Sequence, residues 1–103
     1  MPSIQKKSTI LFVDDETNVL EGIRRTLRHK SSVWDIKCAR SVDEALHLLN
    51  ERSIDAVISD VSMPGKDGFT LLTTIRSTEQ ISDIPVTILT GLNERGIINP
   101  AII

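Results

Sequence analysis

Residues 55–68 read DAVISDVSMPGKDG, and this stretch indicates more of the fold than any other part of the chain. Its first half is a short apolar run that ends at Asp60, which is typical of a strand buried inside a parallel sheet. Its second half, from Met63 to Gly68, is rich in turn residues and predicts a loop. The stretch therefore predicts a buried strand that carries a carboxylate to the edge of a sheet.

Apolar runs of strand length and stretches with helical spacing alternate along the rest of the chain. Ser41 and Glu44 have the spacing of a capping box, in which two side chains satisfy free N–H groups at a helix start. Alternating strands and helices predict an α/β fold whose parallel sheet carries helices on both faces. The predicted strands are 9–13, 34–38, 55–60 and 85–90, and the predicted helices begin near Thr17, Ser41 and Phe69.

Length and composition restrict the class of protein. A chain of 103 residues suits one small domain, 1–103, and its 40% hydrophobic and 25% charged residues suit a soluble one. The net charge of −2 provides no overall field for nucleic acid or an anionic membrane. Cys38 is the only cysteine, and no apolar run approaches the ~20 residues of a membrane span. We therefore expect a cytoplasmic protein that binds neither nucleic acid directly nor a membrane.

Polar side chains follow three of the predicted strands. Asp14 and Asp15 follow the first strand, Asp60 ends the third, and Thr90 ends the fourth. Ligands of open parallel sheets bind outside the carboxyl ends of the strands. Carboxylates so close together would oppose each other's ionisation, unless a hard divalent cation such as Mg²⁺ lies among them. A single aspartate at a strand end is usually a turn or capping residue, and Asp15 or Thr17 is placed to cap the first helix. The joint pattern, however, predicts a site.

Three segments of the sequence resemble the signatures of the response-regulator receiver domain: LFVDDE (11–16), SDVSMPGKDG (59–68) and ILTG (88–91). Their order matches that family, and the resemblance covers about the first nine-tenths of the chain. It implies a flavodoxin-like sheet with strand order 2-1-3-4(-5). It also implies phosphorelay signal transduction in a two-component system rather than an enzyme. Such a domain catalyses only its own phosphorylation and dephosphorylation.

The resemblance implies a role for each matching residue. Asp60 would be the phosphoacceptor, which takes a phosphoryl group from a phosphohistidine of a sensor histidine kinase or a phosphotransfer domain. Mg²⁺, or Mn²⁺ in its place, would be bound by Asp14, Asp15, Asp60 and the backbone carbonyl of Ser62, with Asp14 acting largely through water. Thr90 would hydrogen-bond a phosphoryl oxygen and shift when the phosphate arrives. The loop over the site would be shaped by Met63, Pro64 and Gly68.

The sequence departs from the family after the fourth strand. The family continues with a helix, a fifth strand that ends in a lysine, and a last helix, whereas residues 92–103 form an atypical tail, LNERGIINPAII. No lysine follows Lys66, so the family's phosphate-binding lysine has no counterpart here. The last third of the fold is expected to be missing, and the domain to be partial.

Three alternatives remain open for the tail, which is too short for a parallel crossover. The first is a hairpin with its turn at 93–96 and residues 97–103 antiparallel to the fourth strand, where Pro100 would confine it to the sheet edge. The second is a truncated product. The third is a homodimer that covers the exposed edge of the fourth strand.

Two other functions compete with the phosphoacceptor. One is a pseudo-receiver, a protein-interaction module of the same fold that is never phosphorylated, which the missing lysine favours and the intact acidic cluster opposes. The other, more remote, is a phosphohydrolase with an aspartyl nucleophile after the first strand, because residues 14–17 (DDET) faintly resemble Asp-x-Asp-x-Thr of haloacid-dehalogenase-like phosphatases. Binding of Mg²⁺ would argue against the first. Glu16 in place of the second aspartate and the lack of room for a cap domain argue against the second.

A basic cluster lies at the end of the first predicted helix. Cations are favourable at a helix C-terminus, so a solvated helix end explains the cluster, and a docking surface for an acidic partner is the alternative. We expect the nearby Trp34 to pack in the core or at its edge. The cluster consists of Arg24, Arg25, Arg28, His29 and Lys30.

Overall fold

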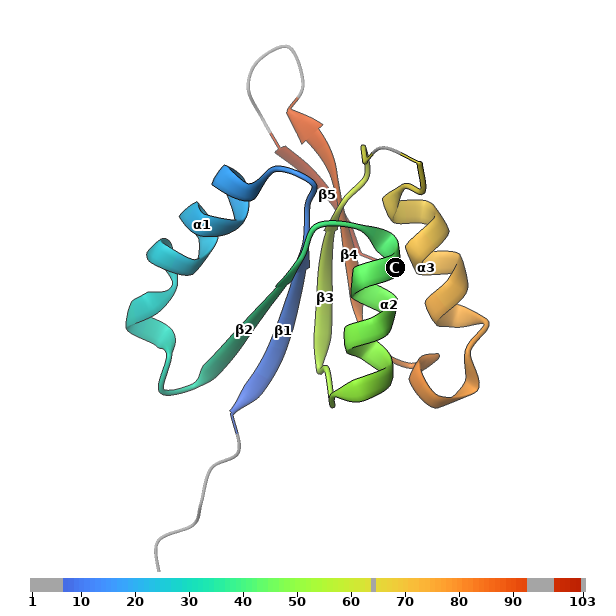
Figure 1. Cartoon of the computed structure of the whole chain (residues 1–103), viewed down its shortest axis with the longest axis horizontal. Helices are drawn as coiled ribbons and strands as arrows, with labels where there is room; N and C mark the ends of the chain where they lie inside the picture. The colour runs from blue at the N-terminus through green and yellow to red at the C-terminus, as the bar shows by residue number, and fades with distance from the viewer. Residues whose placement is uncertain (1–6, 64, 93–97, 103) are drawn as a thin grey trace, which may run out of the picture.

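Five strands form one sheet in the order β2-β1-β3-β4-β5 (Figure 1). The computed structural model describes residues 7–63, 65–92 and 98–102, and only the backbone of 90–92 and 98–102. The first four strands are parallel, and β5 is antiparallel to β4. The predicted α/β fold and the strand order 2-1-3-4 are therefore confirmed. The strands are β1 (Ser8–Val13), β2 (Trp34–Ala39), β3 (Ala56–Asp60), β4 (Val86–Leu92) and β5 (Ile98–Ile102).

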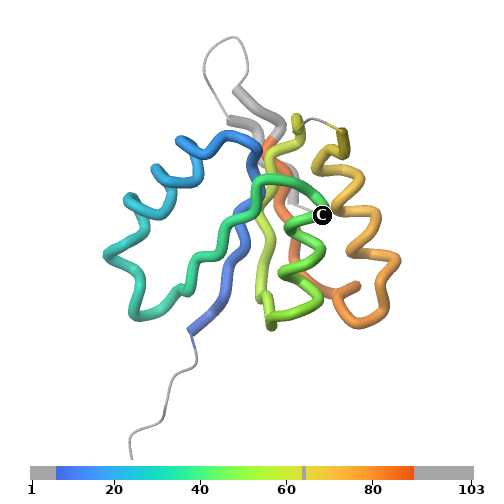
Figure 2. Tube along the Cα trace, in the orientation of Figure 1, coloured from blue at the N-terminus to red at the C-terminus, as the bar shows by residue number. Residues whose placement is uncertain are grey.

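Three helices cover the sheet. Helix α1 lies on one face, and α2 and α3 lie side by side on the other, an arrangement that the chain trace shows most simply (Figures 1 and 2). Within the described part of the chain, no helix has both the length and the hydropathy to cross a membrane. The helices are α1 (Thr17–Thr26), α2 (Val42–Glu51) and α3 (Gly68–Arg76), with short 3₁₀ helices η1 (Arg28–Lys30) and η2 (Glu79–Ile81).

The two faces of the sheet are buried to different extents. Leu11, Val57 and Ile88 point towards α2 and α3 and are fully buried. Ile10 and Ile58, which alternate with them, are only half-buried, because α1 alone covers the other face among the described elements. The continuous apolar runs predict strands buried on both faces, and the structure shows complete burial on one.

The capping box predicted for α2 is present. The Ser41 hydroxyl accepts a hydrogen bond from the Glu44 N–H at 3.1 Å. The Glu44 carboxylate accepts from the N–H of Arg40 at 3.3 Å, one residue before the serine. This local pattern therefore fixes the start of α2 as the sequence predicts.

The start of α1 differs from the prediction. Glu16 is the N-cap residue and makes no side-chain capping bond, so the assignment of Asp15 or Thr17 as the cap is wrong. The Asp14 carboxylate instead accepts from the Glu16 N–H at 2.9 Å. Asp14 therefore shapes the turn that leads from β1 into α1.

The tail after β4 adopts the hairpin alternative. Strand β5 pairs antiparallel with β4, in a register that joins Thr87 to Ile102 and is irregular between Leu89 and Leu92. Pro100 lies in this edge strand, as a proline without an N–H donor must. The predicted turn at 93–96 lies outside the described residues. The edge of β4 that a homodimer was expected to cover is thus occupied by the chain itself.

Gly68 begins α3 in close contact with the end of β3. A Cβ atom built on Gly68 would lie 2.6 Å from the backbone oxygen of Asp60 and 3.1 Å from the Cα of Val61. The Gly68 N–H also donates to the Val61 carbonyl at 3.1 Å. Just before it, Asp67 caps the helix by accepting from the Thr70 N–H at 2.9 Å, which lowers the pKa of its carboxyl. Gly68 is therefore required by close packing of backbone against backbone.

We predict that Gly68→Ala destabilises the domain, because the added methyl group would push the backbone of Asp60 away. Overpacking of this kind costs about 1–3 kcal/mol. The free energy of unfolding, from urea denaturation followed by circular dichroism, measures the effect.

Gly22→Ala is the matched control. Gly22 lies inside α1, and a Cβ atom there would have no neighbour within 4 Å. Alanine is the better helix former by about 0.5–1 kcal/mol, so this variant should gain stability. Equal effects of the two substitutions would contradict the close approach at Gly68.

Candidate functional site

Parallel pairing of β1 with β3 brings the ends of the two strands to the same edge of the sheet. Val13 pairs with Ser59, so Asp14 and Asp60 come next along neighbouring strands. The Asp14 N–H donates to the Ala39 carbonyl of β2 at 3.0 Å and extends the ladder by one residue. Backbone hydrogen bonds therefore bring Asp14 and Asp60 to one edge, and the bond from the Glu16 N–H orients the Asp14 carboxylate.

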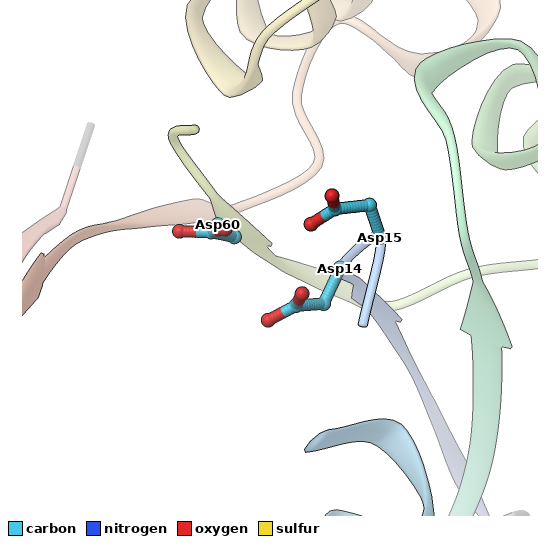
Figure 3. Close-up of side chains that lie close together, drawn as sticks. All are labelled: Asp14, Asp15 and Asp60. Atoms are coloured by element: carbon cyan, nitrogen blue, oxygen red, sulfur yellow. The ribbon is translucent and has the colours of Figure 1, made fainter. Parts of the chain in front are cut away.

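Three carboxylates meet at this edge (Figure 3). Asp14, Asp15 and Asp60 each place one oxygen within 4.8 Å of the other two. Asp14 and Asp60 are half-buried, whereas Asp15 is exposed. The structure thus brings together the three aspartates that the strand-end pattern singled out.

The surroundings of Asp14 disfavour its negative charge. Partial burial raises the pKa of the Asp14 carboxyl above its ordinary value, and the nearby charges of Asp60, Asp15 and Glu16 raise it further. The hydrogen bond from the Glu16 N–H acts in the opposite direction and is outweighed. A positive charge placed among these carboxylates would remove this cost.

The other predicted site residues lie around the cluster. Thr90 is in β4, one residue after Leu89, which pairs with Asp60, but its side chain lies outside the described residues. Ser62 is exposed in the loop that leaves β3. Pro64 lies outside the described residues. Met63 is 8% exposed and packs into the hydrophobic core, so it anchors the start of the loop to the core.

The loop between β3 and α3 is also tied to α2. The Lys66 ammonium group donates to the Asp43 carboxylate at 2.7 Å. Gly65, directly before it, has a φ of 81°, a conformation that glycine adopts at low cost. Sequence reasoning missed this ion pair, because 23 residues separate its partners and no local pattern links them. Lys66 is therefore bound at the first turn of α2.

A cluster of carboxylates with this geometry is suited to a divalent cation. Hard cations such as Mg²⁺ prefer oxygen ligands, and carboxylates supply negatively charged ones. The arrangement is thus chemically suited to holding a metal ion.

Comparison with known proteins agrees with this geometry. Residues 10–102 match the family described as the response regulator receiver domain. Response regulator MprA of Mycobacterium sp. (strain KMS) is 38% identical over 82 residues, which are 80% of this chain and 34% of MprA. Transcriptional regulatory protein YvrH of Bacillus subtilis (strain 168) is 35% identical over 86 residues, 84% of this chain and 35% of YvrH. The chain thus spans about a third of the length of these relatives.

Solved structures show the same flavodoxin-like fold. The N-terminal domain of a response regulator receiver protein from Methanoculleus marisnigri JR1 superposes with a TM-score of 0.74 at 31% identity, over 85% of this chain and 72% of that one. Chemotaxis response regulator CheY4 of Vibrio cholerae gives a TM-score of 0.75 at 26% identity, over 86% and 72% of the two chains. Together with the family match over nearly the whole sequence, they show that the chain belongs to the response regulator receiver domain family.

Proposed function

We propose that this receiver domain accepts a phosphoryl group on Asp60 in the presence of Mg²⁺. The observation that carries the proposal is the meeting of Asp14, Asp15 and Asp60 within 4.8 Å at the end of β1 and β3. The donor would be a phosphohistidine of a sensor histidine kinase or phosphotransfer domain, and the setting the cytoplasm. In this proposal the domain is a switch that modifies itself and has no separate substrate.

The carboxylates fit a magnesium ion. Mg²⁺ binds oxygen at about 2.0–2.1 Å, so oxygens on opposite sides of the ion are about 4.2 Å apart. The three carboxylate oxygens lie within 4.8 Å of one another, which is close enough for one ion to lie among them, bound directly or through water. Asp15 and Asp60 would bind the ion directly, Asp14 largely through water, and the backbone carbonyl of Ser62 would add a ligand. Mn²⁺ accepts the same oxygen ligands.

The chemistry assigned to Asp60 is a single displacement. One carboxylate oxygen of Asp60 forms a bond to phosphorus while the phosphorus–nitrogen bond of the phosphohistidine breaks, and the departing imidazole takes up a proton. A bound divalent cation would neutralise charge on the phosphoryl oxygens during this transfer. Asp60 is suited to the attack because the backbone of β3 and the close contact of Gly68 with the Asp60 backbone oxygen fix its position. The Thr90 hydroxyl would then hydrogen-bond a phosphoryl oxygen.

The pseudo-receiver is retained as a second candidate because of Lys66. The family uses a lysine to bind the phosphate, and the lysine that follows Asp60 most closely is paired with Asp43 at 2.7 Å. Without a cation of its own beside the phosphate, the domain would lose stabilisation of the transferred group. The two candidates differ in one outcome, since only the phosphoacceptor gains a phosphoryl group.

We predict that the protein gains the mass of one phosphoryl group when incubated with acetyl phosphate and Mg²⁺. The Asp60→Asn variant should gain none, because an amide is not a nucleophile towards phosphorus. Intact-protein mass spectrometry, with parallel samples in a chelator, measures both. Asp55→Asn is the matched control, because it changes a carboxylate beside the opposite end of β3 and should leave the phosphorylation unchanged.

Each alternative has its own result. Binding of Mg²⁺ without any mass increase would favour the pseudo-receiver over the phosphoacceptor. A mass increase that persists in Asp60→Asn and disappears in Asp14→Asn would move the nucleophile to Asp14, as the phosphohydrolase requires.

We predict opposite effects of Asp14→Asn with and without Mg²⁺. The raised pKa of Asp14 means that the folded state holds its proton more tightly than the unfolded chain, whose value is near 3.8. Ionised Asp14 therefore costs stability above its folded-state pKa, and the cost disappears as the pH falls towards 3.8. Without metal at neutral pH, Asp14→Asn should be more stable than the parent by less than about 1 kcal/mol, because the carboxylate is only partly buried and solvent screens its charge.

With Mg²⁺ the order should reverse. Binding stabilises the parent by about 1.4 kcal/mol when the cation is present at ten times its dissociation constant. Asp14→Asn should lose most of this gain. Thermal melts in chelator and in Mg²⁺, at neutral pH and near pH 4, test both statements. Asp83→Asn, an exposed carboxylate outside the cluster, should behave like the parent throughout, and a parent indifferent to Mg²⁺ would refute the metal site.

A further inference from the structure

A concave region lies at the opposite end of the sheet from the aspartates. It is a cleft of about 330 Å³ between the last turn of α1, the start of β2 and residue 7. Trp34 begins β2 and pairs with Ser8 at the start of β1, whereas Asp14 and Asp15 follow β1 and Asp60 is the last residue of β3. The cleft is therefore separate from the candidate phosphorylation site.

Three cations line this cleft. Arg24 lies in the last turn of α1, Arg28 begins η1 four residues later, and Lys7 precedes β1. All three side chains are exposed, and no carboxylate among the described residues forms an ion pair with any of them. Arg24 reaches β2, where its charge partly offsets the burial that raises the pKa of the Cys38 thiol. Cations from separate segments thus converge on one space, and none of the three forms an ion pair with a described carboxylate.

The floor of the cleft is apolar. Trp34, Ile36 and Leu27 line it, and each is half-buried, so part of every side chain stays accessible. Trp34 was expected to pack at the core or its edge, and its half-burial leaves part of its surface to the cleft. An indole ring beside arginine side chains can contact a flat ring of a ligand while the arginines bind an anionic group.

One acidic side chain also lines the cleft. Asp35 belongs to it, and its carboxylate pairs with Lys37 at 3.5 Å on the same strand. The Lys37 ammonium group compensates this negative charge locally. The Ser31 hydroxyl supplies a neutral hydrogen-bonding group at the rim. The charge left uncompensated inside the cleft is therefore positive.

We propose that this cleft binds a small organic anion in which a phosphate or similar doubly charged group is joined to a flat ring. Arg24, Arg28 and Lys7 hold the anionic group, and Trp34 contacts the ring. The size of the cleft is at the lower end of small-molecule sites, which suits a single ring system with one charged group. An acidic segment of another protein would use the charges and leave the apolar floor unused.

Trp34 is the only tryptophan of the chain, so its fluorescence reports directly on the cleft. We expect adenosine monophosphate, used as the probe, to change the emission of Trp34 in a saturable manner. Inorganic phosphate and adenosine, which each carry one half of the probe, should bind more weakly. The titrations are done in chelator, so that a metal ion at the aspartates cannot bind the phosphate, and calorimetry confirms the stoichiometry.

The variants test which cations take part. Arg24→Ala and Arg28→Ala should each weaken the binding of adenosine monophosphate about tenfold or more, as expected for loss of a hydrogen bond to a charged group. Arg25→Ala is the matched control, because Arg25 is an exposed neighbour on α1 that does not line the cleft. Circular dichroism verifies that each variant folds, and all four proteins should phosphorylate alike.

Several results would overturn the proposal. One is the absence of saturable binding in the parent. Another is equal weakening by Arg25→Ala, which would indicate only general attraction of anions. Tighter binding of a hexaglutamate peptide than of adenosine monophosphate would assign the cleft to an acidic protein segment instead. If inorganic phosphate binds as tightly as the nucleotide, the ring contributes nothing to binding and Trp34 does not contact it as proposed.

Discussion

The register of β1 against β3 is the constraint on which the site depends. Val13 pairs with Ser59, so the residues that follow, Asp14 and Asp60, lie at one edge. The backbone hydrogen bonds of the sheet hold them there. Partial burial of Asp14 and the like charges of its neighbours oppose folding, and the raised pKa of Asp14 expresses that cost. Burial of apolar side chains on the fully buried face of the sheet contributes the favourable free energy that offsets this cost. A slip by one residue would turn every side chain of a strand to the other face and dissolve the cluster.

Features that depend on neighbouring residues were predictable from the sequence. Ser41 and Glu44 mark the start of α2 by a local capping pattern, and the structure contains the bond from Glu44 to Ser41. The short apolar runs predict the strands. The aspartates at their ends predict the acidic cluster, because parallel strands bring their carboxyl ends to one edge. Pro100 indicated the edge position of β5, since a proline cannot donate to a ladder. These signals act over a few residues, where steric and hydrogen-bonding rules are strongest.

Features that depend on tertiary contacts were not predictable. Phe69 has the spacing of the apolar residues of α3, yet its side chain is 45% exposed, because burial depends on what packs against the helix. The pair of Lys66 with Asp43 joins the loop after β3 to the first turn of α2, and the cleft brings Arg24 of α1 and Trp34 of β2 to one space. The close approach of Gly68 to the backbone of Asp60 belongs to the same class, since a glycine in a loop motif indicates a turn and not its neighbours. Only the assembled sheet places these groups together.

The central claim is that Asp60, and neither of the aspartates after β1, becomes phosphorylated. Borohydride reduces an aspartyl phosphate to homoserine, which marks the position permanently and can be located by sequencing the proteolytic peptides by mass spectrometry. After incubation with acetyl phosphate and Mg²⁺, the account predicts homoserine at position 60 and intact aspartate at positions 14 and 15. Homoserine at position 14 or 15, or at no position in a protein shown to bind Mg²⁺, would contradict it.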